Sequence, residues 1–460
     1  MLGPPSRLRP KPYPLVLEHL ESRANKRLTN EYRADNIRAL ASLESCQDIN
    51  PAMIDLQPEI QWFMRPFLLD FIVELHSSFK LQPQTLFRCF NIVDRYCAKR
   101  IVFKRHYQLV GCTALWIAAK YEDKKSRVPT LKELALMCRN AYDEEMFVQM
   151  ERHILSTLEW SLGRPTLEDC LQLSVEYCNE LNENTTPFRY NRNHMVDTPN
   201  TNSTATNMSS GSSTTSAITA IGRFLCELSL YSRPFLEFET SQIAIAANLL
   251  ACSMLQIPTA SRAFHDIARK ASSSSVSVSV ATTAHENLEN LEPEVLGTFL
   301  NGFDETTPYK IRKIGLLFMQ ALNNITDVLS NKYKPLGVLA VVQNYIAKNM
   351  NFLETLHSMS NEVLEFSVCE MTNTTLTCIA DSFLSLNLVE RPQHPQQDIF
   401  PVTPPSTSQS VFSDRNSSSS SLITPTTNVC KGNPFYTFSP AECASVVEAS
   451  PYYQKQYQGQ

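Results

Sequence analysis

Glycine is scarce in this chain, at 11 of 460 residues. Phosphate-binding loops and tight β-turns depend on glycine, because it adopts positive φ angles without steric cost. The scarcity therefore argues against both and favours a helical protein. No apolar run approaches the roughly 20 residues of a membrane span. The N-terminal stretch "MLGPPSRLRPKPYP" also lacks the apolar core of a signal peptide. We expect a soluble, intracellular protein.

Catalytic and metal-binding motifs are missing as well. The sequence contains no HExxH, GxGxxG, P-loop or GxSxG pattern. Its thirteen cysteines stand singly, without a CxxC pair or a Cys/His ligand spacing, which is typical of reduced, buried thiols. The net charge of −5 does not indicate a basic surface for binding nucleic acid or an anionic membrane. We predict a protein that is not an enzyme and that has no cofactor, no metal site, and neither a nucleic-acid nor a membrane partner.

Composition divides the chain into two helical blocks separated and followed by polar sequence. The insertion "NENTTPFRYNRNHMVDTPNTNSTATNMSSGSSTTS" and the Ser/Thr/Pro-rich tail bury too little apolar surface to order themselves. We predict an all-α protein with these parts: an N-terminal arm (1–30), a first helical domain (31–180), a disordered Asn/Ser/Thr-rich insertion (181–216), a second helical domain (217–390) and a disordered tail (391–460).

Local signals mark where the helices of the first domain begin. Pro83 suits a first helical position, because its missing N–H has no partner there anyway. Capping boxes are predicted at residues 130–133 and 166–169, and Asp143 is a candidate N-cap. Residues 106–121 are apolar almost all round, which is typical of a buried helix. We therefore expect five helices packed around this central one.

Four charged residues lie within apolar segments of the first domain. Lys120 ends the central helix, and Glu151 flanks an apolar stripe two helices later. On the residues alone, both are compatible with partly solvated side chains at the edge of a core as well as with a binding site. Arg65 and Asp94 are also surrounded by apolar residues, where a charge is costly unless paired. We interpret this second pair as a structural ion pair joining two helices.

Five consecutive segments resemble one complete cyclin box in order and spacing. They are "MRPFLLDFIVEL" (64–75), "FNIVDRYCAKRIV" (90–102), "YQLVGCTALWIAAKYED" (107–123), "RVPTLKEL" (127–134) and "MFVQMERHILSTLEW" (146–160). The sequences of these segments are more similar to fungal G1/S-specific cyclins of the Cln type than to mitotic cyclins. Among the Cln type they resemble the Cln3-like branch most. Residues 220–255 resemble the opening of a second cyclin fold, and residues 332–346 its end. This second domain is degenerate in its middle.

The resemblance implies a regulatory subunit without chemistry of its own. A cyclin packs against the mobile helix of a cyclin-dependent kinase and rotates it into the active position. In the family, the lysine that closes the central helix and a glutamate of the fifth helix bind the kinase together. These positions correspond to Lys120 and Glu151. The family's structural Arg–Asp pair corresponds to Arg65 and Asp94.

The resemblance also implies a substrate-docking patch on the first helix. The corresponding residues are Met64, Leu68, Phe71, Glu74 and Gln108. A plain core role for the apolar members stays open, because Met64, Leu68 and Phe71 share one helix face. The neighbouring Pro66 would disrupt a helix interior, so the helix either begins later than in the family or bends.

The tail carries four minimal sites for a proline-directed kinase, at Thr403, Thr424, Ser439 and Ser450. Each phosphate would add about −1.5 to −2 charge and create a binding feature for a basic receptor. We predict that phosphorylation by the cyclin's own kinase marks the chain for a ubiquitin-ligase receptor.

Together these features predict a regulator of a cyclin-dependent kinase at the G1/S transition, located in nucleus and cytoplasm. Its expected partners are the kinase catalytic subunit and the substrates of that kinase. Two alternatives stay open: a Cln-type cyclin that directs polarised or hyphal growth, and a transcription factor or scaffold built from two cyclin folds. The second alternative predicts a strongly basic face, and the net charge of −5 speaks against it.

Overall fold

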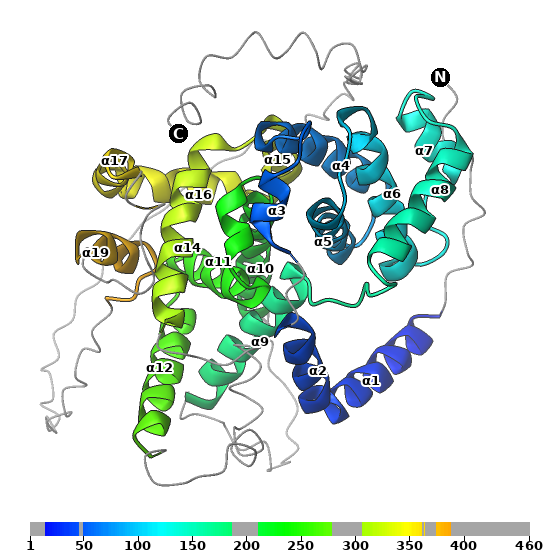
Figure 1. Cartoon of the computed structure of the whole chain (residues 1–460). Coiled ribbons are helices and arrows are strands. Elements are labelled where there is room, and N and C mark those ends of the chain that lie inside the picture. Colours follow the sequence, from blue (N-terminus) through cyan, green and yellow to red (C-terminus); the bar gives the residue numbers. More distant parts are fainter. Residues whose placement is uncertain are drawn as a thin grey trace, which may run out of the picture. The chain divides into compact units, whose positions relative to one another are not determined.

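The structure is a computed structural model that describes residues 14–45, 49–185, 210–277, 306–360, 363 and 374–387. Within these ranges the chain consists of helices, turns and loops, without a β-strand, so the predicted all-α class is confirmed (Figure 1). None of the helices in these ranges is long and apolar enough to cross a membrane. The tail and most of the insertion lie outside the described residues.

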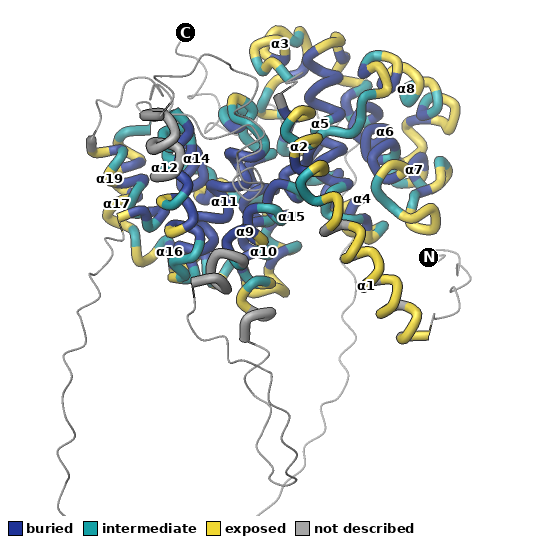
Figure 2. Tube along the Cα trace, turned by 90° about the horizontal axis from the view of Figure 1, so that it is seen from below, coloured by how far each residue is buried: buried dark blue, intermediate teal, exposed yellow. Residues whose placement is uncertain are grey.

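Two helices precede the five-helix fold: α1 (Leu15–Glu31) and α2 (Arg33–Ser45). The structure thus differs from the loose arm expected over residues 1–30. After Pro14 the sequence contains no proline until Pro51, and its leucines, glutamates and arginines are good helix formers. The described side chains of α1 are exposed along its length (Figure 2), whereas α2 buries Ile37.

The first helical fold contains five main helices, preceded by two short ones. Its elements are α3 (Pro51–Asp55), η1 (Trp62–Met64), α4 (Arg65–Phe79), α5 (Pro83–Lys99), α6 (Lys104–Glu122), α7 (Leu131–Met137) and α8 (Glu144–Thr157). Helix α6 is the central one, and α4, α5 and α8 pack against it. Gly111 allows a close approach of α4, because a Cβ atom added there would lie 2.7 Å from Leu68 Cδ1.

The predicted helix starts of this fold are confirmed. Helix α5 begins at Pro83, and Asp143 caps α8 by accepting a hydrogen bond from the N–H of Met146 at 2.8 Å. Capping boxes are present at residues 130–133 and 166–169. Helix α4 begins at Arg65, which places Pro66 in the first turn, where no intrahelical N–H bond is lost. The helix therefore begins next to the proline, which lies outside the helix interior.

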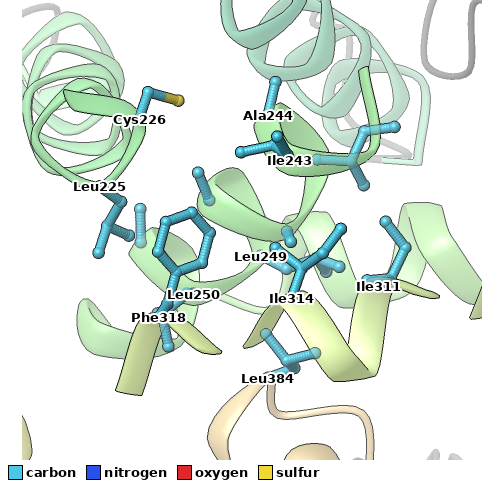
Figure 3. Close-up of a cluster of buried hydrophobic side chains, with 14 of the residues drawn as sticks. Leu225, Cys226, Ile243, Ala244, Leu249, Leu250, Ile311, Ile314, Phe318 and Leu384 are labelled. Atoms are coloured by element: carbon cyan, nitrogen blue, oxygen red, sulfur yellow. The ribbon is translucent and has the colours of Figure 1, made fainter. Parts of the chain in front are cut away.

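The second helical fold repeats the plan of a buried helix surrounded by others. Its elements are α9 (Leu167–Thr185), α10 (Ser210–Ser229), η2 (Arg233–Glu237), α11 (Thr240–Met254), α12 (Thr259–Ser277), α14 (Thr307–Ala321), η4 (Leu322–Asn324), α15 (Asp327–Tyr333), η5 (Lys334–Leu336), α16 (Val338–Lys348), α17 (Met350–Ser358) and α19 (Thr374–Phe383). Helix α11 is buried at every position from Ser241 to Met254. Its Leu250 lies in an apolar cluster with Leu225 of α10 and Phe318 of α14 (Figure 3).

Arg65 and Asp94 form a buried ion pair between α4 and α5. Both side chains are 4% exposed, and the guanidinium bonds both carboxylate oxygens, one of them at 2.9 Å. Burial disfavours the charged guanidinium, but the Asp94 carboxylate outweighs it and raises the pKa of Arg65 above its ordinary value. The Nε of Arg65 also donates to the carbonyl of Leu230 at 2.5 Å. One side chain thus joins two helices of the first fold to the second fold.

Further polar contacts join the two folds. The hydroxyl of Tyr231 donates to Asp70 at 2.7 Å, and the hydroxyl of Thr326 donates to the same oxygen at 2.8 Å. Arg233 forms an ion pair with Asp55 at 2.6 Å. Burial raises the pKa of Asp70, so these two hydroxyl donors compensate part of its lost hydration.

Glu44 of α2 reaches the N-terminus of α11. Its carboxylate accepts a hydrogen bond from the N–H of Ser241 at 2.7 Å, and its side chain is almost fully buried. Burial raises the pKa of Glu44 to about 7, and the nearby Glu239 raises it further, while the bond from Ser241 opposes the shift. Arg164 donates to the carbonyl of Leu43 at 2.7 Å beside it. Helix α2 is thus tied both to the second fold and to the segment between the folds.

Replacing Asp94 by Asn leaves Arg65 buried without its countercharge. We expect Asp94→Asn to lower the free energy of unfolding by about 3–5 kcal/mol, the usual cost of breaking a buried pair. The matched control is Asp35→Asn, because Asp35 pairs with Arg38 at the surface with exposed fractions of 67% and 65%. Urea unfolding followed by circular dichroism measures both variants. Equal losses would show that burial of the Arg65–Asp94 pair does not matter.

Glu44→Gln is expected to change how stability depends on pH. The pKa of Glu44 is about 7 in the folded chain against 4.5 ordinarily, so the folded state retains the proton longer. Its contribution is therefore present below pH 4.5 and is lost as pH rises through 7. Relative to Glu44→Gln, the wild type should lose roughly 2 kcal/mol between pH 5 and pH 7.5. Parallel pH profiles of the two proteins, from urea unfolding, would contradict this.

Candidate functional site

Lys120 and Glu151 meet at the surface of the first fold. Lys120 lies in the last turn of α6, and its ammonium forms an ion pair with the Glu151 carboxylate of α8. The two side chains are 37% and 17% exposed. The Lys120 Nζ also lies 3.4 Å from the centroid of the Trp116 ring. The structure therefore brings together the two residues that the sequence placed on separate helices.

The position of Lys120 follows from the helix that carries it. From Cys112 to Ala119 the residues are 0% to 3% exposed except for the half-buried Trp116, so Lys120 is where this end of α6 reaches solvent. A cation in the last turn also interacts favourably with the partial negative charge of the helix C-terminus. Asp123, just beyond the helix, accepts a hydrogen bond from the N–H of Gln82 at 3.1 Å and one from the hydroxyl of Thr85 at 2.5 Å. The end of α6 is thereby fixed to the start of α5.

Arg88 of α5 fixes the other side of this region. Its Nε bonds Glu122 at the end of α6, and its Nη1 donates to the carbonyls of Leu162 and Arg164, the second at 2.9 Å. The guanidinium carbon also lies 4.7 Å from the ring centroid of Tyr121. One buried arginine therefore holds the end of α6 against the segment that follows α8.

Two exposed aromatic residues belong to the same elements as the ion pair. Tyr121 follows Lys120 and is 52% exposed, and Trp160 follows α8 and is 71% exposed. Trp160 has a φ of +60° and donates its N–H to the carbonyl of Leu155 at 2.9 Å, which ends α8 in a left-handed turn. Exposed tyrosine and tryptophan are enriched in protein interfaces. The sequence reasoning missed both residues, although the motifs "AAKYED" and "LEW" contain them.

The proposed docking patch is divided between core and surface. Leu68 is buried against Gly111 and belongs to the core, whereas Met64, Phe71 and Gln108 are half-buried and Glu74 is exposed. Burial of part of its side chain raises the pKa of Glu74, and Asp70 adds to the effect. An exposed ring that the sequence reasoning missed, Phe67, lies on the same helix and is 47% exposed.

No catalytic centre is visible in the part of the chain that the structure describes. No group of three or more His, Cys, Asp or Glu in that part is placed to hold a metal ion. Burial raises the pKa of the Cys97 thiol to about 12 and lowers the pKa of His76 to about 4. A protonated thiol and a buried histidine with one nitrogen bonded to the carbonyl of Gln82 are poor nucleophiles and bases. The four candidate phosphorylation sites, Thr403, Thr424, Ser439 and Ser450, lie outside the described residues.

Comparison with known proteins agrees with this geometry. Residues 35–163 match the family described as "Cyclin, N-terminal domain", and residues 199–289 match "Cyclin, C-terminal domain". The G1/S-specific cyclin CCN1 of Candida albicans is 47% identical over 440 residues, which cover 81% of this chain and 61% of that protein. The G1/S-specific cyclin CLN3 of the same species is 36% identical over 243 residues, covering 53% and 48%. Cyclin puc1 of Schizosaccharomyces pombe is 45% identical over 136 residues, covering 30% and 38%.

The chain spans about three fifths of the length of CCN1 and about half that of CLN3. Identity is higher and more extensive with CCN1 than with CLN3. The match to the N-terminal domain contains Lys120, Glu151 and the buried Arg65–Asp94 pair, and the match to the C-terminal domain contains the buried helix α11. With both domains present in order, the chain belongs to the cyclin family.

Proposed function

We propose that this chain is a regulatory subunit that binds and activates a cyclin-dependent protein kinase and promotes the G1/S transition. The observation that carries the proposal is the Lys120–Glu151 pair at the solvent-exposed end of the central helix, where the exposed Tyr121 follows Lys120. The printed names of the Candida relatives, G1/S-specific cyclins, support the stage of the cell cycle. We further propose that the protein acts in nucleus and cytoplasm.

The pair is better explained by a partner than by the stability of the fold. A partly exposed ion pair contributes only about 0–1 kcal/mol to folding, because water screens it. An exposed tryptophan such as Trp160 leaves apolar surface in water. A partner that covered both would strengthen the charge-assisted bonds of Lys120 and Glu151 by excluding water. Such a surface would let the chain act by binding, as a regulatory subunit does.

The kinase is the partner whose chemistry fits this surface. A lysine and a glutamate side by side can donate to and accept from the backbone groups of one bound helix end. Docking of a cyclin there would hold the mobile helix of the kinase in its active orientation, which completes the kinase's own Lys–Glu pair. Activation then needs only binding energy and no chemistry from this chain.

Alanine substitutions separate binding from folding. Lys120→Ala and Glu151→Ala should each weaken kinase binding on the order of 10–100-fold, because each leaves a polar group of the interface without its bond. Both should change the free energy of unfolding by less than about 1 kcal/mol. Titration calorimetry with the purified kinase subunit and a histone phosphorylation assay measure the first effect, and urea unfolding measures the second.

The matched control is Arg152→Ala, an exposed charge next to Glu151 on the same helix. It should bind and activate the kinase as the wild type does. If the Lys120→Ala, Glu151→Ala double variant retained full affinity and activation, the interface would lie elsewhere on the chain.

The tail is proposed to set the lifetime of the protein. Phosphorylation at Thr403, Thr424, Ser439 and Ser450 would convert a neutral segment into one with several added negative charges, which a ubiquitin-ligase receptor with a basic site recognises. Truncation before Arg391 should therefore lengthen the half-life severalfold in a translation shut-off experiment. Replacing the four sites by alanine in the full chain should have the same effect. An unchanged half-life in both variants would rule this out.

A further inference from the structure

Five exposed cations gather beside the end of α6. Lys80 follows α4, Lys124, Lys125 and Arg127 lie between α6 and α7, and Lys132 lies in the first turn of α7. Arg127 donates its Nη1 to the carbonyl of Lys80 at 3.4 Å, so the two connections touch. The N–H of Arg127 also bonds the carbonyl of Lys124 at 2.8 Å, which closes a tight turn. We call these five residues the basic cluster.

The acidic residues of the same segment serve internal contacts. Glu122 pairs with the buried Arg88, and Asp123 accepts hydrogen bonds from the start of α5. Glu133 closes the capping box of α7, with Thr130 donating to it at 2.8 Å. These three carboxylates are therefore committed to the fold, and the cations are left facing solvent.

The segment keeps an excess of positive charge, because Glu122 is balanced by Arg88 and only Asp123 and Glu133 offset the five cations. No carboxylate in the described ranges forms an ion pair with any of its five members. This is unusual for a chain with a net charge of −5. Five like charges close together repel one another, so the fold gains nothing from gathering them. An anionic partner would remove that repulsion.

We propose that the basic cluster binds an acidic surface of the kinase catalytic subunit, next to the Lys120–Glu151 contact, and speeds the association of the two proteins. The proposal rests on the proposed function. Continuity supports it, because Lys124 and Lys125 lie directly after the end of α6, whose last turn carries Lys120. Charged rims of interfaces chiefly raise the rate of encounter, since attraction acts before contact.

The composition of the cluster favours an extended acidic protein surface over other anions. A phosphate group is best recognised by arginine forks that converge on it. The cluster has one arginine, which already donates to a carbonyl, and four lysines whose flexible ammonium groups suit diffuse negative charge. Nucleic acid would call for a basic stripe over a larger area, which an acidic chain does not offer.

Charge reversal within the complete chain tests whether the basic cluster speeds association with the kinase subunit. The variant carries Lys124→Glu, Lys125→Glu and Arg127→Glu. We expect its association rate constant with the kinase subunit to fall on the order of tenfold or more at about 0.05 M salt, while the dissociation rate changes less than threefold. At about 0.5 M salt the difference should nearly vanish, because screening is then strong. Stopped-flow fluorescence measures both rates, and circular dichroism checks the fold.

The matched control reverses three exposed cations around the start of α6: Lys99→Glu in the last turn of α5, and Lys104→Glu and Arg105→Glu in the first turn of α6. The helix has 19 residues, so this site lies about 28 Å from the cluster. The control should associate as the wild type does.

Normal association of the cluster variant, or an equal loss in the control, would overturn the inference alone. The same holds if the cluster variant associates normally and loses binding to a phosphothreonine peptide instead. If the wild type binds no kinase at either salt concentration, the proposed function fails, and this inference fails with it.

Discussion

The buried Arg65–Asp94 pair is the contact on which the rest of the structure depends. It joins α4 to α5 inside the first fold, and the remaining Nε of Arg65 reaches the carbonyl of Leu230 in the second. Phe90 and Trp62 lie 5.3 and 5.8 Å from the guanidinium, so aromatic faces cover the charge on its other sides. A guanidinium has five donors in a fixed plane, and this one is satisfied from two folds at once. Arg65 therefore helps to set the orientation of the two folds, together with the contacts of Asp70 and Asp55.

Helix α5 connects the buried Arg65–Asp94 pair to the residues at the end of α6. Asp94 anchors it in the core, and two turns earlier Arg88 holds both the end of α6 and the segment after α8. Lys120 and Glu151 are thus presented by elements that the same helix fixes. Precise placement matters for a site of two residues, because hydrogen bonds weaken steeply when their geometry is poor. The surface proposed to bind the kinase is consequently held in place by contacts within the fold.

Sequence alone predicted the features that depend on neighbouring residues. The capping boxes at 130–133 and 166–169 need only a hydroxyl and a carboxylate three residues apart, so the pattern sufficed. The contact between Glu44 and Ser241 joins residues 197 positions apart, and no local sequence pattern predicts it. For Leu68 the sequence left both a docking patch and a core role open, and the close approach allowed by Gly111 leaves it buried at 6% exposure. Burial is a property of the assembled fold, which explains why these assignments needed the structure.

The charges of the first fold divide into two classes with different physical roles. Buried charges such as Arg65, Asp94 and Arg88 are all paired, since an unpaired charge in the core would cost several kcal/mol. The five cations of the basic cluster form no ion pair within the described ranges, and water already solvates them, so they contribute little to folding. The carboxylates beside these cations, including Asp123 after the end of α6, instead accept hydrogen bonds at the starts of helices. Placing unpaired cations at the surface, apart from the paired charges of the core, does not increase stability. It does give the interface proposed at the end of α6 a positive electrostatic field without destabilising the core.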